Sequence, residues 1–430
     1  MSERARDAAH AIWGAALAAG DVSPLVTRVL RREGDQIVIA DRAYPPRVRV
    51  FGCGKASGAM ALAVESVLEE CVVDGLVVVK DGYTAPTRRI RLAEAGHPVP
   101  DARGEAAALE IVDRVRAAHA EDLVLFLVSG GGSALTPAPA PPVTLAEKQE
   151  TTRLLLGAGA TINELNAVRK HLSLLKGGQL ARAAAPAPVV SLILSDVVGD
   201  PLDVIASGPT APDRSTFAEA LAVLERKGVA TRVPAPVWQR LTAGAEGRIE
   251  ETPKPGDRLF ERVRNVVIGN NALVVDAAAA EARRLGYRAE LLTRSLQGEA
   301  RDVARELVAR TRVLASRTCL IAGGETTVTV RGRGRGGRCQ EFALAAALEL
   351  RSSDALTILA AGTDGTDGPT DAAGGIADHG TVARGERGGR SAAAALEDND
   401  AYTFLTAAGD LVRSGPTNTN LLDLYLVLKS

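Results

Sequence analysis

The chain has 430 residues, with 51 basic and 52 acidic side chains and a net charge of -1, which gives no support to nonspecific binding of nucleic acid or of an anionic membrane. Hydrophobic residues make up 46% of the chain but aromatic residues only 3%, a balance that favours helices packed on a parallel sheet over a β-sandwich. A chain of this length is typical of two domains, so we predict a two-domain α/β protein.

The cysteines and the apolar runs indicate a cytoplasmic protein. The four cysteines are scattered and show no C-x-x-C spacing, so reduced thiols are the simplest interpretation. No apolar run approaches the ~18 residues of a membrane-spanning helix, and the start Met-Ser-Glu-Arg-Ala-Arg lacks the pattern of a signal peptide. We expect neither a membrane nor a nucleic acid as partner, and a homodimer is left open.

The first glycine turn of the chain carries a lysine. Residues 3–32 are predicted to form two helices, and the stretch 47–60 then predicts a buried strand, a glycine turn with Lys55, and a helix start. The turn matches neither G-x-x-x-x-G-K-[ST] nor G-x-G-x-x-G, so it indicates anion binding without fixing the class of ligand. The alternative is an ordinary turn of a doubly wound sheet with a solvated lysine.

Two further predicted strands end in loops of the same kind. The strand over 122–128 runs into a serine–glycine loop, and the strand over 189–194 runs into Asp196 and Asp200. Backbone N–H groups of a glycine loop can approach phosphate oxygens, although a flexible turn has the same composition. We predict that the serine–glycine loop binds the nucleotide phosphates through Ser129, Gly130, Gly131, Gly132 and Ser133.

Between these two strands the sequence predicts helices over 144–156 and 163–185. In the second helix, polar and basic residues recur at three- and four-residue spacing and form one face that could meet an anion. A solvated helix face explains this periodicity equally well. The face consists of Asn163, Asn166, Arg169, Lys170 and Lys176, and we predict Arg169 as a substrate-binding residue.

A polar stretch rich in proline, between about residues 212 and 260, marks the passage between two predicted domains, 1–245 and 260–430. The second domain repeats the pattern of strands that end in polar loops. Strands are predicted over 263–268, 318–322, 326–331 and 356–361, with a helix over 340–350. The residues that follow these strands include Asn270, Gly323, Gly324 and Glu325, predicted to bind nucleotide or phosphate, and Arg338, Asp364, Asp367 and Asp371.

These loops supply the groups that phosphoryl transfer requires. Loops at the carboxyl ends of parallel strands gather at one edge of a sheet, where open α/β proteins bind ligands. Lys55 and Arg338 would stabilise the charge of a transferring phosphoryl group. Mg²⁺ takes one or two carboxylates together with substrate phosphates. We predict Asp196, Asp364 and Asp371 as metal ligands, while Asp364 and Asp367 are also explained as turn residues or as a calcium loop.

Eight motifs, in order and over nearly the whole chain, carry a family resemblance. They resemble the bacterial and archaeal glycerate 2-kinase family, whose C-terminal half is a MOFRL domain. A departure is Cys339, where asparagine is usual in the arginine motif. The motifs are Gly52-Cys-Gly-Lys-Ala-Ser57, Gly96-His-Pro-Val-Pro-Asp101, Val128-Ser-Gly-Gly-Gly-Ser-Ala134, Asn163-Glu-Leu-Asn-Ala-Val-Arg-Lys-His171, Leu194-Ser-Asp-Val-Val-Gly-Asp200, Gly323-Gly-Glu-Thr-Thr-Val328, Gly336-Gly-Arg-Cys-Gln-Glu341 and Gly362-Thr-Asp-Gly-Thr-Asp-Gly-Pro-Thr-Asp371.

The resemblance implies ATP-dependent phosphorylation of D-glycerate at its 2-hydroxyl, with Mg²⁺, to give 2-phosphoglycerate and ADP. It also implies a larger N-terminal Rossmann-like domain with a parallel sheet flanked by helices, a smaller C-terminal α/β domain, and an active site in the cleft between them. Carried over by motif, Lys55 and Arg338 correspond to the candidate catalytic pair of the family and are predicted to contact the substrate. We expect Asp196 to lie nearest the transferred group.

Two other functions compete with this one. Relatives of the family are also called hydroxypyruvate reductases. However, no G-x-G-x-x-G motif opens a helix here, and there is no clear acidic residue at the position that would bind the ribose of a nicotinamide cofactor. Both absences argue against a nicotinamide enzyme. A sugar-phosphate-binding sensor would use the same glycine loops. Such a sensor would not need Asp196, Asp364 and Asp371, so these carboxylates favour the kinase. The sequence leaves the choice among small hydroxy acids open.

Overall fold

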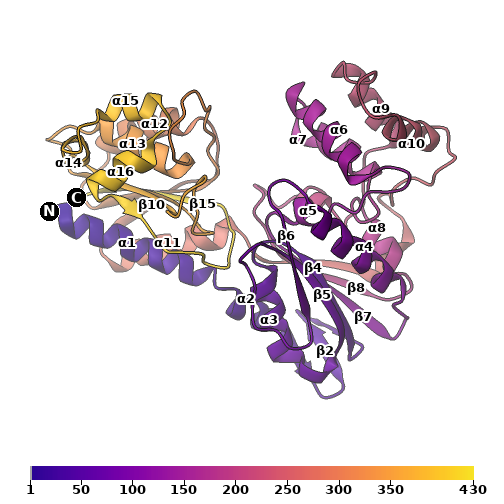
Figure 1. Cartoon of the computed structure of the whole chain (residues 1–430). Helices are drawn as coiled ribbons and strands as arrows, with labels where there is room; N and C mark the ends of the chain where they lie inside the picture. The colour runs from indigo at the N-terminus through magenta and orange to yellow at the C-terminus, as the bar shows by residue number, and fades with distance from the viewer. Residues whose placement is uncertain (1) are drawn as a thin grey trace. The chain divides into compact units, whose positions relative to one another are not determined.

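The computed structural model describes residues 2–430, which divide into two compact units. The larger unit is Val22–Ile268, and the smaller one joins the residues up to Asp21 with Gly269–Ser430 (Figure 1). This division differs from the expected domains 1–245 and 260–430. Helix α1 (Ser2–Ala19) buries Ile12 and Trp13 and packs on helix α11 (Asn271–Arg284) of the smaller unit. An amphipathic pattern identifies a helix, but it does not say which sheet the helix will cover.

The larger unit is built on a six-stranded sheet in the order β6-β5-β4-β7-β8-β9. The pairs β4/β5, β5/β6, β4/β7 and β7/β8 are parallel, as predicted. Every residue of β7 is buried, which is typical of a parallel sheet covered by helices on both faces. The strands are β4 (Arg47–Cys53), β5 (Val72–Lys80), β6 (Arg91–Ala95), β7 (Asp122–Val128), β8 (Val189–Leu194) and β9 (Val263–Gly269).

Helices on both sides of this sheet follow from apolar residues at helical spacing. Helix α4 (Ala102–Arg116) buries Ala108, Ile111 and Val115, and Asp101 caps its N-terminus by accepting a hydrogen bond from the Gly104 N–H. The other helices next to the sheet are α3 (Ser57–Leu68), α5 (Gly132–Leu135) and α8 (Gln179–Ala184), and α2 (Val22–Val29) packs on α3.

The pattern-based assignment of residues 3–32 to two helices is partly wrong. Residues 30–44 form a small antiparallel sheet, β1 (Leu30–Glu33), β2 (Gln36–Ile39) and β3 (Arg42–Tyr44). Leu30, Ile37 and Ile39 are buried, so β1 joins the core through its first residue while its remaining residues are exposed. A run of charged residues such as Arg31-Arg32-Glu33 carries no alternation by which a strand could be told from a helix end.

Four helices of the larger unit form a group of their own, seen beyond α5 in Figure 1. They share a core that includes Leu155, Phe217 and Leu241. The helix predicted over 163–185 is broken, because α7 ends at His171 and α8 begins only at Gln179. Gly177 and Gly178 lie in the break with φ of +59° and +80°, which glycine adopts without strain. The group consists of α6 (Leu145–Gly157), α7 (Ile162–His171), α9 (Phe217–Arg226) and α10 (Ala235–Ala245).

The smaller unit has a mixed six-stranded sheet in the order β10-β11-β15-β12-β13-β14. Only β10/β11 is parallel, and the last strand of the chain, β15, lies antiparallel between β11 and β12. The strand expected over 326–331 does not form, and only Thr327 makes an isolated bridge there. The strands are β10 (Arg288–Leu296), β11 (Thr318–Gly324), β12 (Leu356–Gly362), β13 (Gly374–Asp378), β14 (Leu411–Val412) and β15 (Asp423–Lys429).

Helices cover both faces of this second sheet. In Figure 1, α1 and α11 lie on one side of β10 and β15, and α12, α13, α15 and α16 lie on the other. The second face has a core that contains Phe342, Phe404 and Tyr425. None of the helices in residues 2–430 is long and apolar enough to cross a membrane. The helices are α12 (Ala300–Arg312), α13 (Arg338–Glu349), α14 (Thr381–Glu386), α15 (Ala392–Glu397) and α16 (Ala401–Ala408).

Candidate active site

In the larger unit, the Lys55 turn and the serine–glycine loop lie against each other at the carboxyl ends of β4 and β7. The Lys55 N–H donates to the Gly130 carbonyl (2.9 Å), and the Ala56 N–H donates to the Ser129 hydroxyl (2.9 Å). A Cβ at Gly54, where φ is +137°, would stand 2.1 Å from Ser129 Oγ, so only glycine fits. The two loops that the sequence identified separately are therefore one structure.

Gly131 of the serine–glycine loop lies beside the side chain of Lys55. Gly131 has φ of +84°, and a Cβ there would stand 3.0 Å from the His97 ring and 3.7 Å from Cγ of Lys55. Because Gly131 has no side chain, the His97 ring and the Lys55 stem pack beside its backbone. His97 thus borders the serine–glycine loop.

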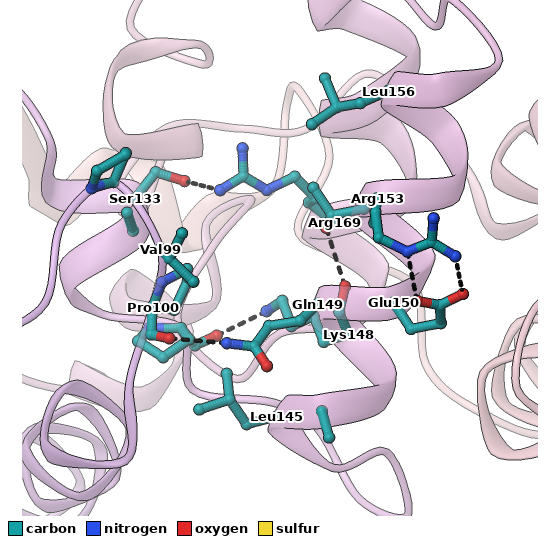
Figure 2. A pocket seen from close by; sticks show the side chains of 15 residues that line it. Val99, Pro100, Ser133, Leu145, Lys148, Gln149, Glu150, Arg153, Leu156 and Arg169 are labelled. Atoms are coloured by element: carbon teal, nitrogen blue, oxygen red, sulfur yellow. Dashed lines mark hydrogen bonds and ion pairs between the residues drawn. The ribbon is translucent and has the colours of Figure 1, made fainter.

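The hydroxyl of Ser133 forms hydrogen bonds with two basic side chains and with a second hydroxyl. Its Oγ accepts hydrogen bonds from Nη2 of Arg169 (2.8 Å) and from Nζ of Lys176 (2.7 Å), and Lys176 also donates to the Ser133 carbonyl (2.7 Å). The hydroxyls of Ser133 and Ser207 share a further hydrogen bond of 2.9 Å. Figure 2 shows Arg169 reaching across to Ser133. Lys176 lies in the break between α7 and α8. The continuous helix predicted over 163–185 would therefore have given its side chain a different position.

The positive charge around Ser133 is not neutralised. Lys148 lies nearby, with Nζ donating to the carbonyls of Pro137 (2.6 Å) and Leu172 (3.2 Å). Burial lowers the pKa of Lys176 well below its usual value, and the charges of Arg169 and Lys148 lower it further. Burial, then the Arg169 charge, does the same to the pKa of Lys148. The charge of Glu105 opposes the shift at Lys148, but across residues 2–430 no carboxylate forms an ion pair with Arg169, Lys148 or Lys176, so the group favours an anion.

A strained segment holds Ser207 in this group. Ala206, Ser207 and Gly208 have φ of +49°, +62° and +64°, a left-handed conformation that residues with a Cβ adopt at a cost. The Ser207 hydroxyl also donates to Oδ1 of Asn166 on α7 (3.1 Å). Strain at the two successive residues Ala206 and Ser207, beside a cationic group, is typical of a functional site.

The remaining members of the predicted basic face do not join the group. Lys170 is buried and pairs with Asp213 (3.2 Å) and Asp203 (3.6 Å), so these two carboxylates neutralise its charge.

Asp196 lies in the loop after β8 and is partly buried, at the same edge of the sheet as the serine–glycine loop. Its predicted role at the metal or at the transferred group stays a prediction.

A cavity of about 640 Å³ opens beside Ser133 and Arg169 (Figure 2). Its walls come from the segment after β6, from the residues around α5, from α6, and from α7. The lining residues are Pro98, Val99, Pro100, Ser133, Ala134, Pro137, Leu145, Ala146, Lys148, Gln149, Glu150, Thr152, Arg153, Leu156 and Arg169.

In the smaller unit, Arg338 is the first residue of α13 and is held by two carboxylates. Its Nε and Nη2 donate to both oxygens of Asp423 (2.6 and 2.9 Å), and Nη1 pairs with Glu325 (2.7 Å). Burial lowers the pKa of Arg338, but the Asp423 carboxylate outweighs it and raises that pKa above its usual value. The Tyr425 hydroxyl donates to Asp423 Oδ2 (2.9 Å), which holds this carboxylate in position.

The predicted metal ligands of this unit have different surroundings. Asp371 is exposed and accepts a hydrogen bond from the Tyr402 hydroxyl (2.7 Å), while Asp364 is buried and accepts from the Thr366 N–H (3.0 Å). No three His, Cys, Asp or Glu side chains of the described chain gather as a metal site. Mg²⁺ needs only one or two carboxylates besides phosphates, and both Asp364 and Asp371 carry carboxylate oxygens of the kind that it takes.

Asp367 has the most perturbed carboxyl group among these loop residues. It accepts hydrogen bonds from the N–H groups of Cys339 (3.2 Å) and Gln340 (2.8 Å) at the start of α13. Burial and, to a lesser degree, the neighbouring charge of Asp423 raise its pKa to about 7, against the hydrogen bond from Gln340. Asp367 is therefore more than a turn residue, because its carboxylate accepts hydrogen bonds from the N-terminus of α13, the helix that carries Arg338.

The glycines predicted to bind phosphate in this unit lie close to other backbone. A Cβ at Gly323 would stand 1.8 Å from Oδ1 of Asn271, and one at Gly324, where φ is +150°, would stand 2.3 Å from the backbone of Leu296. Close packing alone therefore requires these glycines. Asn270 precedes α11, but its neighbour Asn271 is the buried one, and it donates to the Leu421 carbonyl (2.8 Å).

Sequence reasoning did not single out several of these residues. Ser207 and Asp423 have no local pattern that separates them from ordinary loop and strand residues, and Lys148 looks like any polar residue of an amphipathic helix. Lys176 was part of the predicted basic face, although no role was assigned to it. Their positions follow from tertiary packing, which spacing along the chain does not reveal.

Comparisons with known proteins place these observations in a family. A family model described as "Domain of unknown function (DUF4147)" matches residues 8–242, and the model of the MOFRL family matches residues 318–423. The chain is 40% identical over 425 residues to a protein of Pyrococcus horikoshii named glycerate 2-kinase, with 96% of this chain and 95% of that one covered.

Two further comparisons agree over most of the chain. A protein of Agrobacterium vitis named putative hydroxypyruvate reductase is 42% identical over 394 residues, covering 89% of this chain and 88% of that one. The crystal structure of a glycerate kinase from Thermotoga maritima superimposes with a TM-score of 0.87 at 39% identity, and 100% of each chain is covered.

Proposed function

The chain belongs to the glycerate kinase family, and from this premise we propose that it is a glycerate 2-kinase, which transfers a phosphoryl group from ATP to the 2-hydroxyl of D-glycerate. The products are 2-phosphoglycerate and ADP. Both substrates are anions, one through its phosphates and the other through its carboxylate. The proposal therefore requires a site at which negative charge is held in place.

The observation that carries this proposal is the cationic group around Ser133. Arg169 and Lys176 meet at one hydroxyl, Lys148 lies behind them, and no carboxylate neutralises them within the described residues. Unpaired buried cations cost free energy in the absence of a ligand, and a bound anion recovers that cost. A phosphate or a carboxylate of a substrate is the anion that a kinase for an acid provides.

The proposed roles follow the chemistry of the side chains. Lys55 beside the serine–glycine loop stabilises the negative charge of the transferring group, and the backbone of Gly131 approaches a phosphate oxygen. Arg338, oriented by Asp423 and Glu325, is proposed as the second catalytic cation. Asp196 is proposed to accept the proton of the 2-hydroxyl or to hold the metal.

Mg²⁺ would supply charge neutralisation of the ATP phosphates when bound. Asp196 in the larger unit and Asp364 and Asp371 in the smaller one are carboxylates suited to it, and Asp371 also contacts Tyr402 and Arg413. Glu325, Asn270, Gly323 and Gly324 are proposed to contribute to nucleotide binding only through the backbone and carboxylate groups that packing leaves accessible.

A coupled assay of ADP release tests the function. With ATP, Mg²⁺ and D-glycerate we expect steady ADP release that stops when D-glycerate is left out. The matched arm supplies hydroxypyruvate and NADH, because one relative is named a putative hydroxypyruvate reductase. NADH oxidation without ADP release would overturn the proposal in favour of a reductase, and no turnover in either arm would favour a binding protein.

A further inference from the structure

The cavity beside Ser133 has a charged end and an apolar body. Arg169 and Ser133 line one end, and Lys176, which donates a hydrogen bond to Ser133, adds positive charge there. Apolar side chains, those of Val99, Pro100, Leu145 and Leu156 among them, line the same cavity (Figure 2). A ligand that fits both parts carries negative charge at one end and a larger apolar or aromatic group at the other.

Two apolar side chains of this cavity are left in water. Val99 is 67% exposed and Leu156 is 59% exposed, although both line the cavity. Scattered apolar residues on a surface need no explanation, but two that line one hollow do. Covering them with the flat face of a ligand recovers the free energy of apolar burial.

The size of the cavity decides between the two substrates. A volume of about 640 Å³ lies within the range of ~300–1,000 Å³ that holds ligands of drug size. Glycerate has three carbons, four oxygens and no apolar group that could cover Val99 or Leu156. A nucleoside triphosphate has an aromatic base, a ribose and a chain of phosphates, and it matches the cavity in length and in polarity.

One amide in the cavity can distinguish the base. Nε2 of Gln149 donates to the Pro100 carbonyl (2.7 Å), which fixes the amide and leaves its Oε1 without a hydrogen bond inside the described chain. Figure 2 shows this oxygen on the side away from Pro100. A fixed carbonyl oxygen accepts from an amino group, such as the exocyclic amine of adenine.

We propose that this cavity binds the base and ribose of ATP, with the phosphates directed to Arg169, Ser133 and the glycine loop toward Lys55. The inference rests on the proposed kinase function and adds the orientation of the nucleotide. It assigns Arg169 to ATP rather than to the acceptor, and it assigns specificity for the base to Gln149. The triphosphate then ends beside Gly131, where the Lys55 stem lies.

Direct binding tests the proposal without turnover. The full chain is titrated calorimetrically with the non-hydrolysable analogue AMP-PNP and Mg²⁺, and separately with D-glycerate. Ala146 is exposed on α6 and lines the cavity, so Ala146→Trp fills the apolar body without entering the core. Ala218→Trp, on the exposed face of α9, is the matched control. We expect Ala146→Trp to weaken AMP-PNP binding at least tenfold and to leave D-glycerate binding unchanged, with Ala218→Trp like wild type.

A second variant keeps the test independent of cavity filling. Gln149→Ala removes the amide and should weaken AMP-PNP binding several-fold, while binding of the analogue with hypoxanthine in place of adenine is unaffected. Unchanged AMP-PNP binding in both Ala146→Trp and Gln149→Ala, or a loss confined to D-glycerate, overturns the proposal. If wild type binds AMP-PNP and Ala146→Trp weakens it but glycerate is not phosphorylated, the cavity assignment stands and the proposed function falls.

Discussion

At the scale of single residues, the larger unit places three cations where no carboxylate neutralises them. Arg169 and Lys176 meet at Ser133, and Lys148 lies behind them. An ammonium group in a dry interior is costly unless an anion accompanies it. The site is thus built for a ligand that brings negative charge, and its protonation should change when that ligand binds.

Proton uptake should accompany nucleotide binding. Burial lowers the pKa of Lys176 well below its usual value, so the free enzyme holds its proton less firmly. A bound phosphate favours the ammonium form and raises this pKa again, so binding takes up protons and becomes stronger as the pH falls. Calorimetry of AMP-PNP binding in two buffers of different ionisation enthalpy measures the uptake. Lys176→Met should reduce it, and proton release, or uptake unchanged in Lys176→Met, would contradict this account.

Lys55→Ala should impair catalysis much more than folding. The removal of one preorganised charge at a transition state costs about 10²–10³-fold in kcat, whereas Lys55 lies in a partly exposed turn. Steady-state kinetics and thermal melting of the same preparation measure both effects. Lys227→Ala is the control, because Lys227 pairs with Glu164 on the outer helices. Near-normal turnover of Lys55→Ala would remove Lys55 from the mechanism.

At the scale of elements, short segments between regular structures hold the functional groups. Ser207 lies in a left-handed segment, and Lys176 lies in the break between α7 and α8. In each case the backbone departs from the regular pattern just where a side chain reaches the site. Such segments are held in place by the tertiary structure around them.

The strain at Ser207 can be separated from its hydroxyl. Ser207→Ala and Ser207→Gly both remove the hydrogen bonds to Ser133 and Asn166, but only glycine adopts a φ of +62° without cost. Ser207→Gly should therefore be more stable than Ser207→Ala by about 1 kcal/mol. Urea unfolding of the two variants measures the difference. Equal stability of the two, or a more stable alanine variant, would mean that the segment is not strained.

The Tyr425 hydroxyl should act on catalysis through Arg338. Tyr425→Phe keeps the ring contact with Phe342 but removes the hydrogen bond to the Asp423 carboxylate that orients Arg338. We expect kcat to fall several-fold with little change in the KM of D-glycerate, because the substrate itself is not contacted. Tyr287→Phe in the same unit serves as the control. A loss of stability with unchanged kcat would leave Tyr425 with a purely structural role.

The strands of the parallel sheet and their loops were predictable, because a strand followed by glycines and a helix is a local pattern. The strands over 122–128 and 189–194 are confirmed as β7 and β8. The sheet β1–β3 and the break at Gly177 and Gly178 were not found, since one lacks alternation and the other interrupts a helical composition. The contacts of Ser133 with Arg169 and Lys176 depend on how α7 returns to the loop, which residue spacing does not encode.

At the scale of the whole molecule, the chain begins in one compact unit, passes through the other and then returns. Helix α1 belongs with residues 269–430, although it precedes the larger unit in sequence. Arg6 on this helix pairs with the buried carboxylates of Asp378 (3.0 Å) and Asp410 (2.6 Å), which Arg384 also contacts. The first turns of the chain are therefore part of the stability of the smaller unit.

Arg6→Ala should destabilise the smaller unit selectively. Removing one partner of two buried carboxylates is costly, here by about 1–3 kcal/mol because Arg384 remains. Hydrogen exchange measured by mass spectrometry should show faster exchange in β13 and α14 but not in β4 or β7. Arg4→Ala, at an exposed position on the same helix, is the control. Equal acceleration in both units, or none in either, would contradict the assignment of α1.

The central claim is the transfer of phosphate to the 2-hydroxyl of D-glycerate, and the structure of the product tests it most directly. The enzyme is incubated with ATP, Mg²⁺ and D-glycerate, and the product is analysed by phosphorus and proton NMR. We predict a phosphorus signal coupled to the single proton at C2, with one ADP formed for each product molecule. Coupling to the two protons at C3, or ADP formation without a phosphorylated acid, would contradict the account.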